Sequence, residues 1–331
     1  MEKLMNNEKH YITLNNYLQY RFNKKVFKIS LNGNFTCPNR DGTISKIGCL
    51  FCSENGSGDF AGEKTKSFKE QFQDIELMMR KKWHDGYYIA YLQANTNTYD
   101  TIENLEKKYN EIINLDPRIK IFSIATRPDC VNNKVIELLK SLNKKIEIWI
   151  ELGFQTSNEE SARFINRGYN NQCFIDTVNK LYQANITTIV HIINGLPKDT
   201  YSDMIETVKF LNVLPISGIK IHMLHIMKNT PLCKIYEENQ FKLLSLEEYT
   251  KIVCEQLRLL NTNIVIHRIT GDAPKDLLVA PEWTLKKFVV MNEIDKLMRK
   301  NNWYQGDKLK NNQWLIDCFL LDKISNILST I

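Results

Sequence analysis

Three cysteines in one stretch form the clearest chemical pattern in the sequence. Eleven residues separate Cys37 from Cys49, and Cys52 follows after two more, all within residues 28–62. The stretch is rich in Gly, Asn and Ser, which let the backbone approach a bulky inorganic group closely. In a chain that we expect to be cytosolic, thiols grouped in this way indicate metal ligands rather than disulfides.

Three cysteine thiolates can be ligands in several kinds of metal site. A structural zinc site takes four ligands, and no fourth Cys or His lies nearby in the sequence. A zinc deaminase uses a pair spaced like Cys49 and Cys52 but also needs an upstream His-x-Glu, whereas His10 is followed by Tyr and Ile. An iron–sulfur cluster normally takes four cysteines, so three leave one iron open. An open iron suits the amino and carboxylate groups of S-adenosylmethionine. We favour this interpretation, and zinc or unrelated core thiols remain the alternatives.

The cysteines directly follow the first of six predicted strands, so we expect them on the first loop at the carboxyl-terminal ends of the strands. Short β-branched runs alternate with amphipathic helical patterns, which predicts a parallel sheet or barrel. Six strand–helix units are fewer than the eight of a complete barrel, so we predict an α/β fold with a partial (β/α)6 barrel. We expect strands at 25–29, 87–93, 119–126, 147–154, 188–194 and 218–226, and helices at 68–84, 101–115, 132–141, 158–184 (as two helices) and 201–213.

The pattern divides the chain into three parts. Residues 1–25 are predicted to be an N-terminal helical segment, and residues 26–226 the barrel core, with a cluster loop at 37–62. Residues 227–331 are predicted to be a C-terminal α/β extension packed on the barrel. In it, a capping box from Ser245 to Glu248 starts a helix, a strand covers 264–270, and a second helix runs from about 284 to 301.

Charge and hydropathy limit the kinds of partner. The chain has 331 residues, with 44 Lys and Arg against 38 Asp and Glu, a net charge of +6 that permits an anionic partner such as RNA. No apolar run reaches the ~18 residues of a membrane-spanning helix, and the N-terminus lacks the apolar segment of a secretory signal. We therefore expect a cytoplasmic protein that has no membrane partner.

The sequence resembles the radical S-adenosylmethionine superfamily. The resemblance is carried by CPNRDGT…GCLFC and by the later motifs YLQANTNTY, ATRPDC, ELGFQT…INRGY, HIINGLP, KIHMLH and HRITGDAP. It is most similar to the YhcC/YtqA-type proteins, to which MnmL-type tRNA modification enzymes belong, and more distantly to the catalytic subunit of elongator. The resemblance implies a [4Fe–4S] cluster on Cys37, Cys49 and Cys52, with S-adenosylmethionine as cofactor. The common superfamily spacing between the first two cysteines is three residues, and here it is eleven.

The resemblance also implies contacts to S-adenosylmethionine at the strand ends. Gln93 and Asn95 stand where many relatives carry glycines that receive the methionine amine. Gln155 and Arg167 match a Gln and an Arg of coproporphyrinogen oxidase-type enzymes, and a guanidinium suits the methionine carboxylate. His191 lies on a strand that resembles the adenine-binding strand. The alternatives are that Arg167 neutralises a helix C-terminus and that His191 is a core histidine.

Other polar residues near the strand ends have no assigned role. Arg127 and Asp129 either face the substrate or pair with each other. His222 and His225 are predicted to point to opposite faces of the sixth strand, so that only one of them is expected to line a pocket. The role of Cys130 stays open. Further candidates for substrate contact are Lys220, His267, Arg268 and Asp272.

The resemblance implies an enzyme that modifies the wobble uridine (position 34) of tRNA. In this chemistry a reduced cluster cleaves S-adenosylmethionine to a 5′-deoxyadenosyl radical, which abstracts hydrogen from the substrate. The implied reaction converts 5-carboxymethylaminomethyl(-2-thio)uridine to 5-aminomethyl(-2-thio)uridine. The implied partners are the tRNA anticodon loop, whose unstacked bases can enter a pocket, and an electron donor such as flavodoxin or ferredoxin. Two alternatives stay open: radical chemistry on a small molecule or peptide, and a non-catalytic, zinc-stabilised RNA-binding protein.

Overall fold

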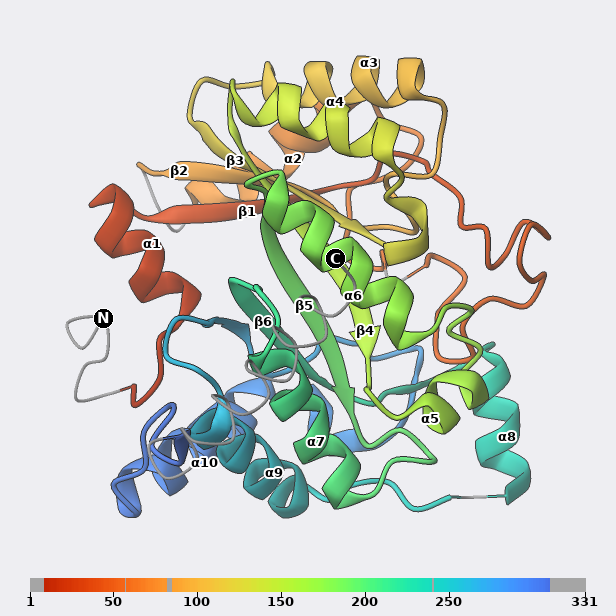
Figure 1. The fold of residues 1–331 in the computed structure, drawn as a ribbon, viewed down its shortest axis with the longest axis vertical. Coiled ribbons are helices and arrows are strands. Elements are labelled where there is room, and N and C mark those ends of the chain that lie inside the picture. The colour runs from red at the N-terminus through yellow and green to blue at the C-terminus, as the bar shows by residue number, and fades with distance from the viewer. Residues whose placement is uncertain (1–8, 57, 82–84, 240, 310–331) are drawn as a thin grey trace, which may run out of the picture.

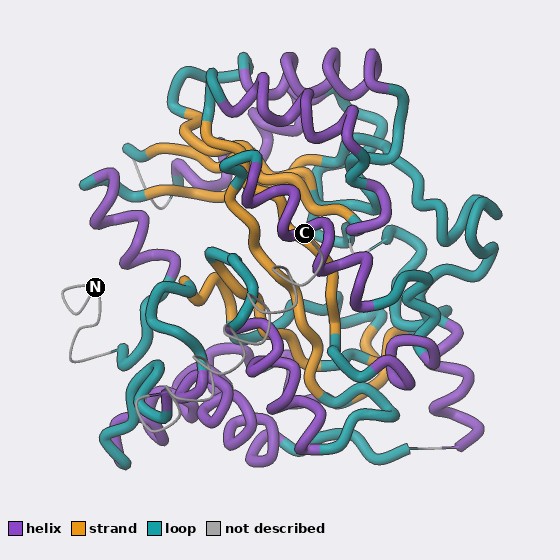
Figure 2. The backbone as a smooth tube through the Cα atoms, in the orientation of Figure 1, coloured by secondary structure: helices purple, strands orange, loops and turns teal. Residues whose placement is uncertain are grey.

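A curved, seven-stranded parallel sheet forms the centre of the computed structural model, which describes residues 9–56, 58–81, 85–239 and 241–309 (Figures 1 and 2). Its strand order is β1-β2-β3-β4-β5-β6-β8, so each strand up to β6 pairs with the next one along the chain. The strands are β1 Val26–Leu31, β2 Tyr87–Leu92, β3 Ile119–Thr126, β4 Glu147–Gln155, β5 Thr187–Asn194, β6 Gly218–Met223 and β8 Val265–Arg268. This architecture confirms the predicted α/β partial barrel.

Helices cover the outer face of the sheet, where α3 and α4 lie side by side at the top of the view (Figure 1). The helices are α1 Leu14–Phe22, α2 Phe68–Arg80, α3 Ile102–Ile113, α4 Asn133–Asn143, α5 Glu159–Phe164, α6 Asn171–Gln183, α7 Tyr201–Asn212, α8 Pro231–Asn239, α9 Leu246–Leu259 and α10 Lys287–Lys300. In the described part of the chain, no helix is both long enough and apolar enough to cross a bilayer.

The sheet has one strand more than the six that the pattern predicts. The sixth expected strand ends at Met223, and the following β7, Ile226–Met227, pairs instead with β9, Leu278–Ala280, in a separate antiparallel sheet. Strand β8 pairs with β6 in parallel. An open edge of β6 would leave backbone N–H and C=O groups without partners, and β8 supplies them. Residues 310–331, with Cys318, lie outside the described residues.

Side chains that accept hydrogen bonds from the first turn determine where the helices begin. Ser245 caps α9 with Glu248 in the predicted capping box, and Ser67 and Thr200 cap α2 and α7 in the same way. A capping side chain satisfies backbone N–H groups that have no partner within the helix. These local signals fix the residue at which each of the three helices begins.

The barrel interior is layered, because alternate residues of each strand point inward. At the amino-terminal end of the strands, Ile89, Ile121, Trp149 and Ile189 form an apolar cluster with Leu18 of α1. This cluster closes that end of the barrel. Two residues further along the strands the inward-facing side chains become polar, and the layer they form faces a cavity.

A buried carboxyl group in the β5–α7 loop allows a prediction on stability. Burial raises the pKa of Asp199 to about 6, and the Thr156 hydroxyl donates a hydrogen bond to it at 3.2 Å. Folding raises the pKa of this carboxyl above its unfolded value, which is near 4, so the group stabilises the folded protein most below pH 4. This stabilisation is lost as the pH rises through the folded pKa of about 6. At pH 7.5 we expect Asp199→Asn to be more stable than the parent by about 1–2 kcal/mol, after allowance for solvent screening.

Urea unfolding at pH 7.5 and pH 4.5 measures this difference. The gain should shrink towards zero at pH 4.5, where the parent carboxyl is largely protonated. The exposed Asp276→Asn variant is the control and should show little gain at either pH. A gain for Asp199→Asn that does not depend on pH would contradict the prediction.

Candidate active site

A cavity of about 510 Å³ lies at the carboxyl ends of the strands and extends into the barrel. Its lining includes the thiols of Cys37, Cys49 and Cys52. In parallel α/β folds the carboxyl ends of the strands carry the ligand sites. The structure therefore brings the cysteine cluster to the position that the sequence predicts.

Hydrogen bonds from both ends of the cysteine loop hold it in place. The Arg40 guanidinium donates to the carbonyls of Cys52 at 3.1 Å and Glu54 at 2.8 Å. The Asn39 amide donates to the Cys49 sulfur at 3.5 Å and to the Asn166 carbonyl at 2.7 Å. The loop is thus tied to itself and to the turn after α5.

The three thiols fit an open iron–sulfur cluster. A hydrogen bond with Cys52, together with burial, raises the pKa of the Cys49 thiol, and a bound metal would favour the thiolate instead. Within the described residues, no three His, Cys, Asp or Glu side chains converge as ligands of a single ion. A [4Fe–4S] cluster bonds each thiolate to a different iron, so its ligands can surround one face of a cavity without converging on one point. This donor set suits a cluster better than a single zinc ion.

Four of the five residues predicted to contact the cofactor line this cavity: Gln93, Asn95, Gln155 and His191. Asn95 has φ +60°, and its side-chain amide donates to the Phe35 carbonyl at 3.0 Å. Gln155 has φ +66°, which is uncommon for a residue other than Gly or Asn. Backbone strain of this kind clusters at functional sites, so Gln155 suits a role in ligand binding, whereas a positive φ is ordinary for Asn95.

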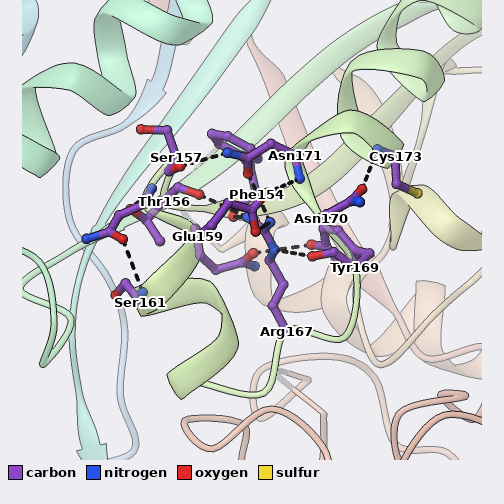
Figure 3. Close-up of polar contacts among 12 residues, drawn as sticks. Phe154, Thr156, Ser157, Glu159, Ser161, Arg167, Tyr169, Asn170, Asn171 and Cys173 are labelled. Carbon is purple, nitrogen blue, oxygen red and sulfur yellow. Dashed lines mark hydrogen bonds and ion pairs between the residues drawn. The ribbon is translucent and has the colours of Figure 1, made fainter.

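Arg167 does not line the cavity, and its side chain is 1% exposed (Figure 3). Its guanidinium donates to the carbonyls of Tyr169, Phe154 and Thr156 at 2.9 to 3.0 Å. The remaining N–H groups reach Asn171 at 2.9 Å and Glu159 at 3.4 Å. All five donors of the guanidinium are therefore engaged. The geometry disagrees with the expected contact to the methionine carboxylate, because Arg167 instead joins the end of β4 to the start of α6.

Arg127 lines the cavity and also pairs with Asp129, so it fits both alternatives expected from the sequence, a position facing the substrate and an ion pair with Asp129. Its guanidinium makes two hydrogen bonds to the Asp129 carboxylate, at 3.0 and 2.8 Å, and a third to the Arg167 carbonyl at 2.9 Å. Its charge also acts on the Cys49 thiol, where it opposes the rise in pKa. Arg127 is therefore the guanidinium that faces the cluster end of the cavity.

Two charged residues in the polar layer, Lys28 and Glu151, are not among the candidates that the sequence indicated. The Glu151 carboxylate is fully buried and accepts hydrogen bonds from Ser123 at 2.7 Å and from Lys28 at 3.1 Å. Its other oxygen contacts His191 at 2.7 Å and the Lys220 ammonium. Lys28 and Glu151 had a sequence signal, because each is a charged residue in an apolar strand, and such a residue is costly to bury unless it is paired.

Three further histidines, His222, His225 and His267, also line the cavity. The expected opposition of His222 and His225 is wrong, because β6 ends at Met223 and His225 lies in the connection between β6 and β7, so that both line the cavity. Burial lowers the pKa of all three histidines. One ring nitrogen of each is buried without a hydrogen-bond partner among the described residues. All three rings are therefore neutral at pH 7.

Comparisons with known proteins agree with this geometry. A family model described as the Radical SAM superfamily matches residues 37–211, and a model described as the Radical_SAM C-terminal domain matches residues 216–300. The chain is 46% identical to the uncharacterized protein YtqA of Bacillus subtilis, over 91% of this chain and 93% of that protein. It is 26% identical to a tRNA-2-methylthio-N(6)-dimethylallyladenosine synthase of Clostridium botulinum, over 50% of this chain and 38% of that protein.

One solved structure shares the fold over most of the chain. The archaeal Elp3 of Methanocaldococcus infernus superposes with a TM-score of 0.62 and 16% identity. The superposition covers 85% of this chain and 64% of the Elp3 chain. At this identity the likeness concerns the fold alone.

Proposed function

Because the chain belongs to the radical S-adenosylmethionine superfamily and to its YhcC/YtqA-type proteins, we propose that it modifies the wobble uridine of tRNA. The proposed reaction converts 5-carboxymethylaminomethyl(-2-thio)uridine to 5-aminomethyl(-2-thio)uridine. The observation that carries the proposal is that three cysteines and a set of polar strand-end residues line one cavity. The same cavity can hold a cofactor next to a substrate base.

The cofactors of this enzyme are a [4Fe–4S] cluster and S-adenosylmethionine, which supply one-electron chemistry that removes hydrogen from a substrate carbon. We propose that Cys37, Cys49 and Cys52 hold the cluster. Gln93 and Gln155 then offer amide groups to S-adenosylmethionine from two strand ends. The apolar cluster around Trp149 excludes water from the far end of the barrel, which protects a reactive intermediate.

Two observations support tRNA as the substrate. The synthase of Clostridium botulinum, similar over half of this chain, acts on tRNA according to its name. The net charge of +6 also favours a polyanion as partner. A base in the anticodon loop is unstacked more readily than one in a duplex, so it can enter the cavity. We further propose a cytoplasmic location and an electron donor such as flavodoxin or ferredoxin.

The direct test incubates anaerobically reconstituted protein with reductant, S-adenosylmethionine and tRNA that carries 5-carboxymethylaminomethyluridine. We expect 5′-deoxyadenosine in the reaction and the 5-aminomethyl nucleoside in the digested tRNA, both measured by mass spectrometry. Formation of 5′-deoxyadenosine with an unchanged wobble nucleoside would overturn the tRNA assignment and favour a small molecule or peptide. Stoichiometric zinc in place of iron and acid-labile sulfide would instead favour the RNA-binding scaffold.

A further inference from the structure

The polar layer inside the barrel has more positive than negative groups. Lys28 and Lys220 both contact the single carboxylate of Glu151, and the side chains of these lysines are 25% and 9% exposed. Among the described residues, no second carboxylate lies within ion-pair distance of either lysine. Of the other cations that line the cavity, Arg127 has Asp129 as its own counter-ion, and Arg268 pairs with Asp272, which Lys287 also contacts from outside the cavity lining.

The remaining neighbours add no negative charge to this layer. Burial and the nearby Lys220 lower the pKa of His191 to about 4, so this ring is neutral at pH 7. Burial raises the pKa of Tyr91, so its hydroxyl is neutral too. The centre of the Tyr91 ring lies 4.2 Å from the Lys28 ammonium and 4.5 Å from the Lys220 ammonium, and its hydroxyl accepts a hydrogen bond from Lys220 at 3.4 Å. These contacts compensate the two positive charges only in part.

Lys220 is the more deeply buried of the two lysines, and it shares its carboxylate partner with Lys28. Burial lowers the pKa of Lys220 to about 7, although Glu151 acts in the opposite direction. Burial opposes ionisation of Glu151, but Lys220 and Lys28 hold the pKa of this carboxyl well below its usual value. One ionised carboxylate therefore serves two ammonium groups. The neutral rings of His222 and His267 also line the cavity.

We propose that Lys220 and Lys28 bind a carboxylate group of the substrate inside the barrel. The inference rests on the proposed function and deepens it, because the proposed substrate carries a carboxymethyl group that must be recognised before it is removed. Ammonium groups in a water-poor site bind carboxylates through charge-assisted hydrogen bonds. Glu151 is then a positioning residue that keeps both ammonium groups directed toward the cavity.

The depth of the layer favours the substrate over the cofactor as the source of this carboxylate. Lys28, Glu151 and Lys220 come three or four residues before the ends of β1, β4 and β6. At a rise of ~3.3 Å per residue, they lie roughly 10 to 13 Å below the edge where the cysteine loop begins. Cys37, Cys49 and Cys52 would hold the cluster on the loop beyond this edge, so a carboxylate that reaches the two lysines would bind deeper in the cavity than the cluster. His191, the residue of this layer that the family resemblance connects with the cofactor, contacts the Glu151 carboxylate at 2.7 Å.

A first experiment measures anion binding by the reconstituted protein, with and without saturating S-adenosylmethionine. The probe is sodium acetate, compared with sodium chloride plus acetamide at equal concentrations, and the readout is the shift in the thermal-unfolding midpoint. We expect acetate to stabilise the parent with the cofactor bound, and to have no specific effect on Lys220→Met. Lys251→Met is the matched control, because that lysine also pairs with a carboxylate, that of Glu247 at 2.6 Å, and neither residue lines the cavity. It should respond to acetate like the parent.

A second experiment compares two substrates that differ in one charge: the 5-carboxymethylaminomethyluridine nucleoside and its methyl ester. We expect the parent to bind the acid more tightly than the ester, and Lys220→Met to lose this preference by roughly 10- to 100-fold, as for a charged hydrogen bond. Lys220→Arg should retain most of the preference, and Lys28→Met should weaken it. Because each variant is compared with itself on two ligands, a partial loss of folded protein does not mimic the result.

The outcomes separate this inference from the proposed function. If the parent fails to modify tRNA but acetate still stabilises it through Lys220, the carboxylate site stands and the tRNA assignment falls. If tRNA is modified but Lys220→Met keeps the full preference for the acid, the site is refuted and the assignment stands. If S-adenosylmethionine abolishes the acetate effect and Lys220→Met weakens cofactor binding, the carboxylate belongs to the cofactor, and the inference is overturned.

Discussion

Replacement of Cys37, Cys49 or Cys52 by alanine is expected to reduce 5′-deoxyadenosine formation by more than about 1,000-fold. Each variant removes one of the three thiolates, and a cluster held by two is displaced readily by solvent or lost. The thiols line the cavity on a loop that hydrogen bonds hold in place, so the rest of the fold should survive. The measurements are iron and sulfide content after anaerobic reconstitution, and 5′-deoxyadenosine by chromatography.

Two cysteines outside the loop provide a control and a further test for the cluster prediction. Cys254 is buried on α9, far along the chain from the loop, and Cys254→Ala should keep normal iron content. Cys130 lies close enough to Cys37 for its thiol to interact with it electrostatically, so Cys130→Ala tests whether a fourth thiol takes part. Full activity in any of the three loop variants would refute the cluster assignment. Loss of iron in Cys130→Ala would add a fourth residue to it.

Arg167→Ala is expected to lower the free energy of unfolding by about 3–5 kcal/mol, because it leaves buried carbonyls and a carboxylate without their shared partner. The side chain is 1% exposed and joins the end of β4 to α6. Arg167→Lys keeps the charge but cannot reproduce five directed donors, so we expect a loss of about 2 kcal/mol. Urea unfolding of the unloaded protein measures both values.

The binding of S-adenosylmethionine distinguishes this structural role from the contact that the family resemblance implies. If Arg167 only joins β4 to α6, folded Arg167→Lys should bind the cofactor within about threefold of the parent. A direct contact to the methionine carboxylate would instead weaken binding by roughly 10-fold or more and leave stability nearly unchanged. The exposed Arg163→Lys on α5 is the control and should change neither quantity.

The strands and the cysteine loop could be predicted because their signals are local. The apolar run of β3 and the capping box of Ser245 and Glu248 depend on neighbours in the chain. The spacing of Cys37, Cys49 and Cys52 likewise specifies a donor set before any fold is known. The strand predicted at 264–270 is confirmed as β8, Val265–Arg268, but its place as the seventh strand of the central sheet was not predicted, because it depends on pairing with the distant β6.

The amino-acid sequence by itself determined the type of chemistry, the alternation of strands and helices, and the end of the barrel at which that chemistry occurs. Only the tertiary structure decided what each charged side chain does. Arg167 occupies a motif position that is typical of cofactor binding, yet its guanidinium donates hydrogen bonds to backbone carbonyls instead. Lys28, Glu151 and Lys220 are far apart in the chain and meet inside the barrel. The physical reason is that hydrogen bonds and ion pairs between distant strands depend on distance and burial in space, which spacing along the chain does not encode.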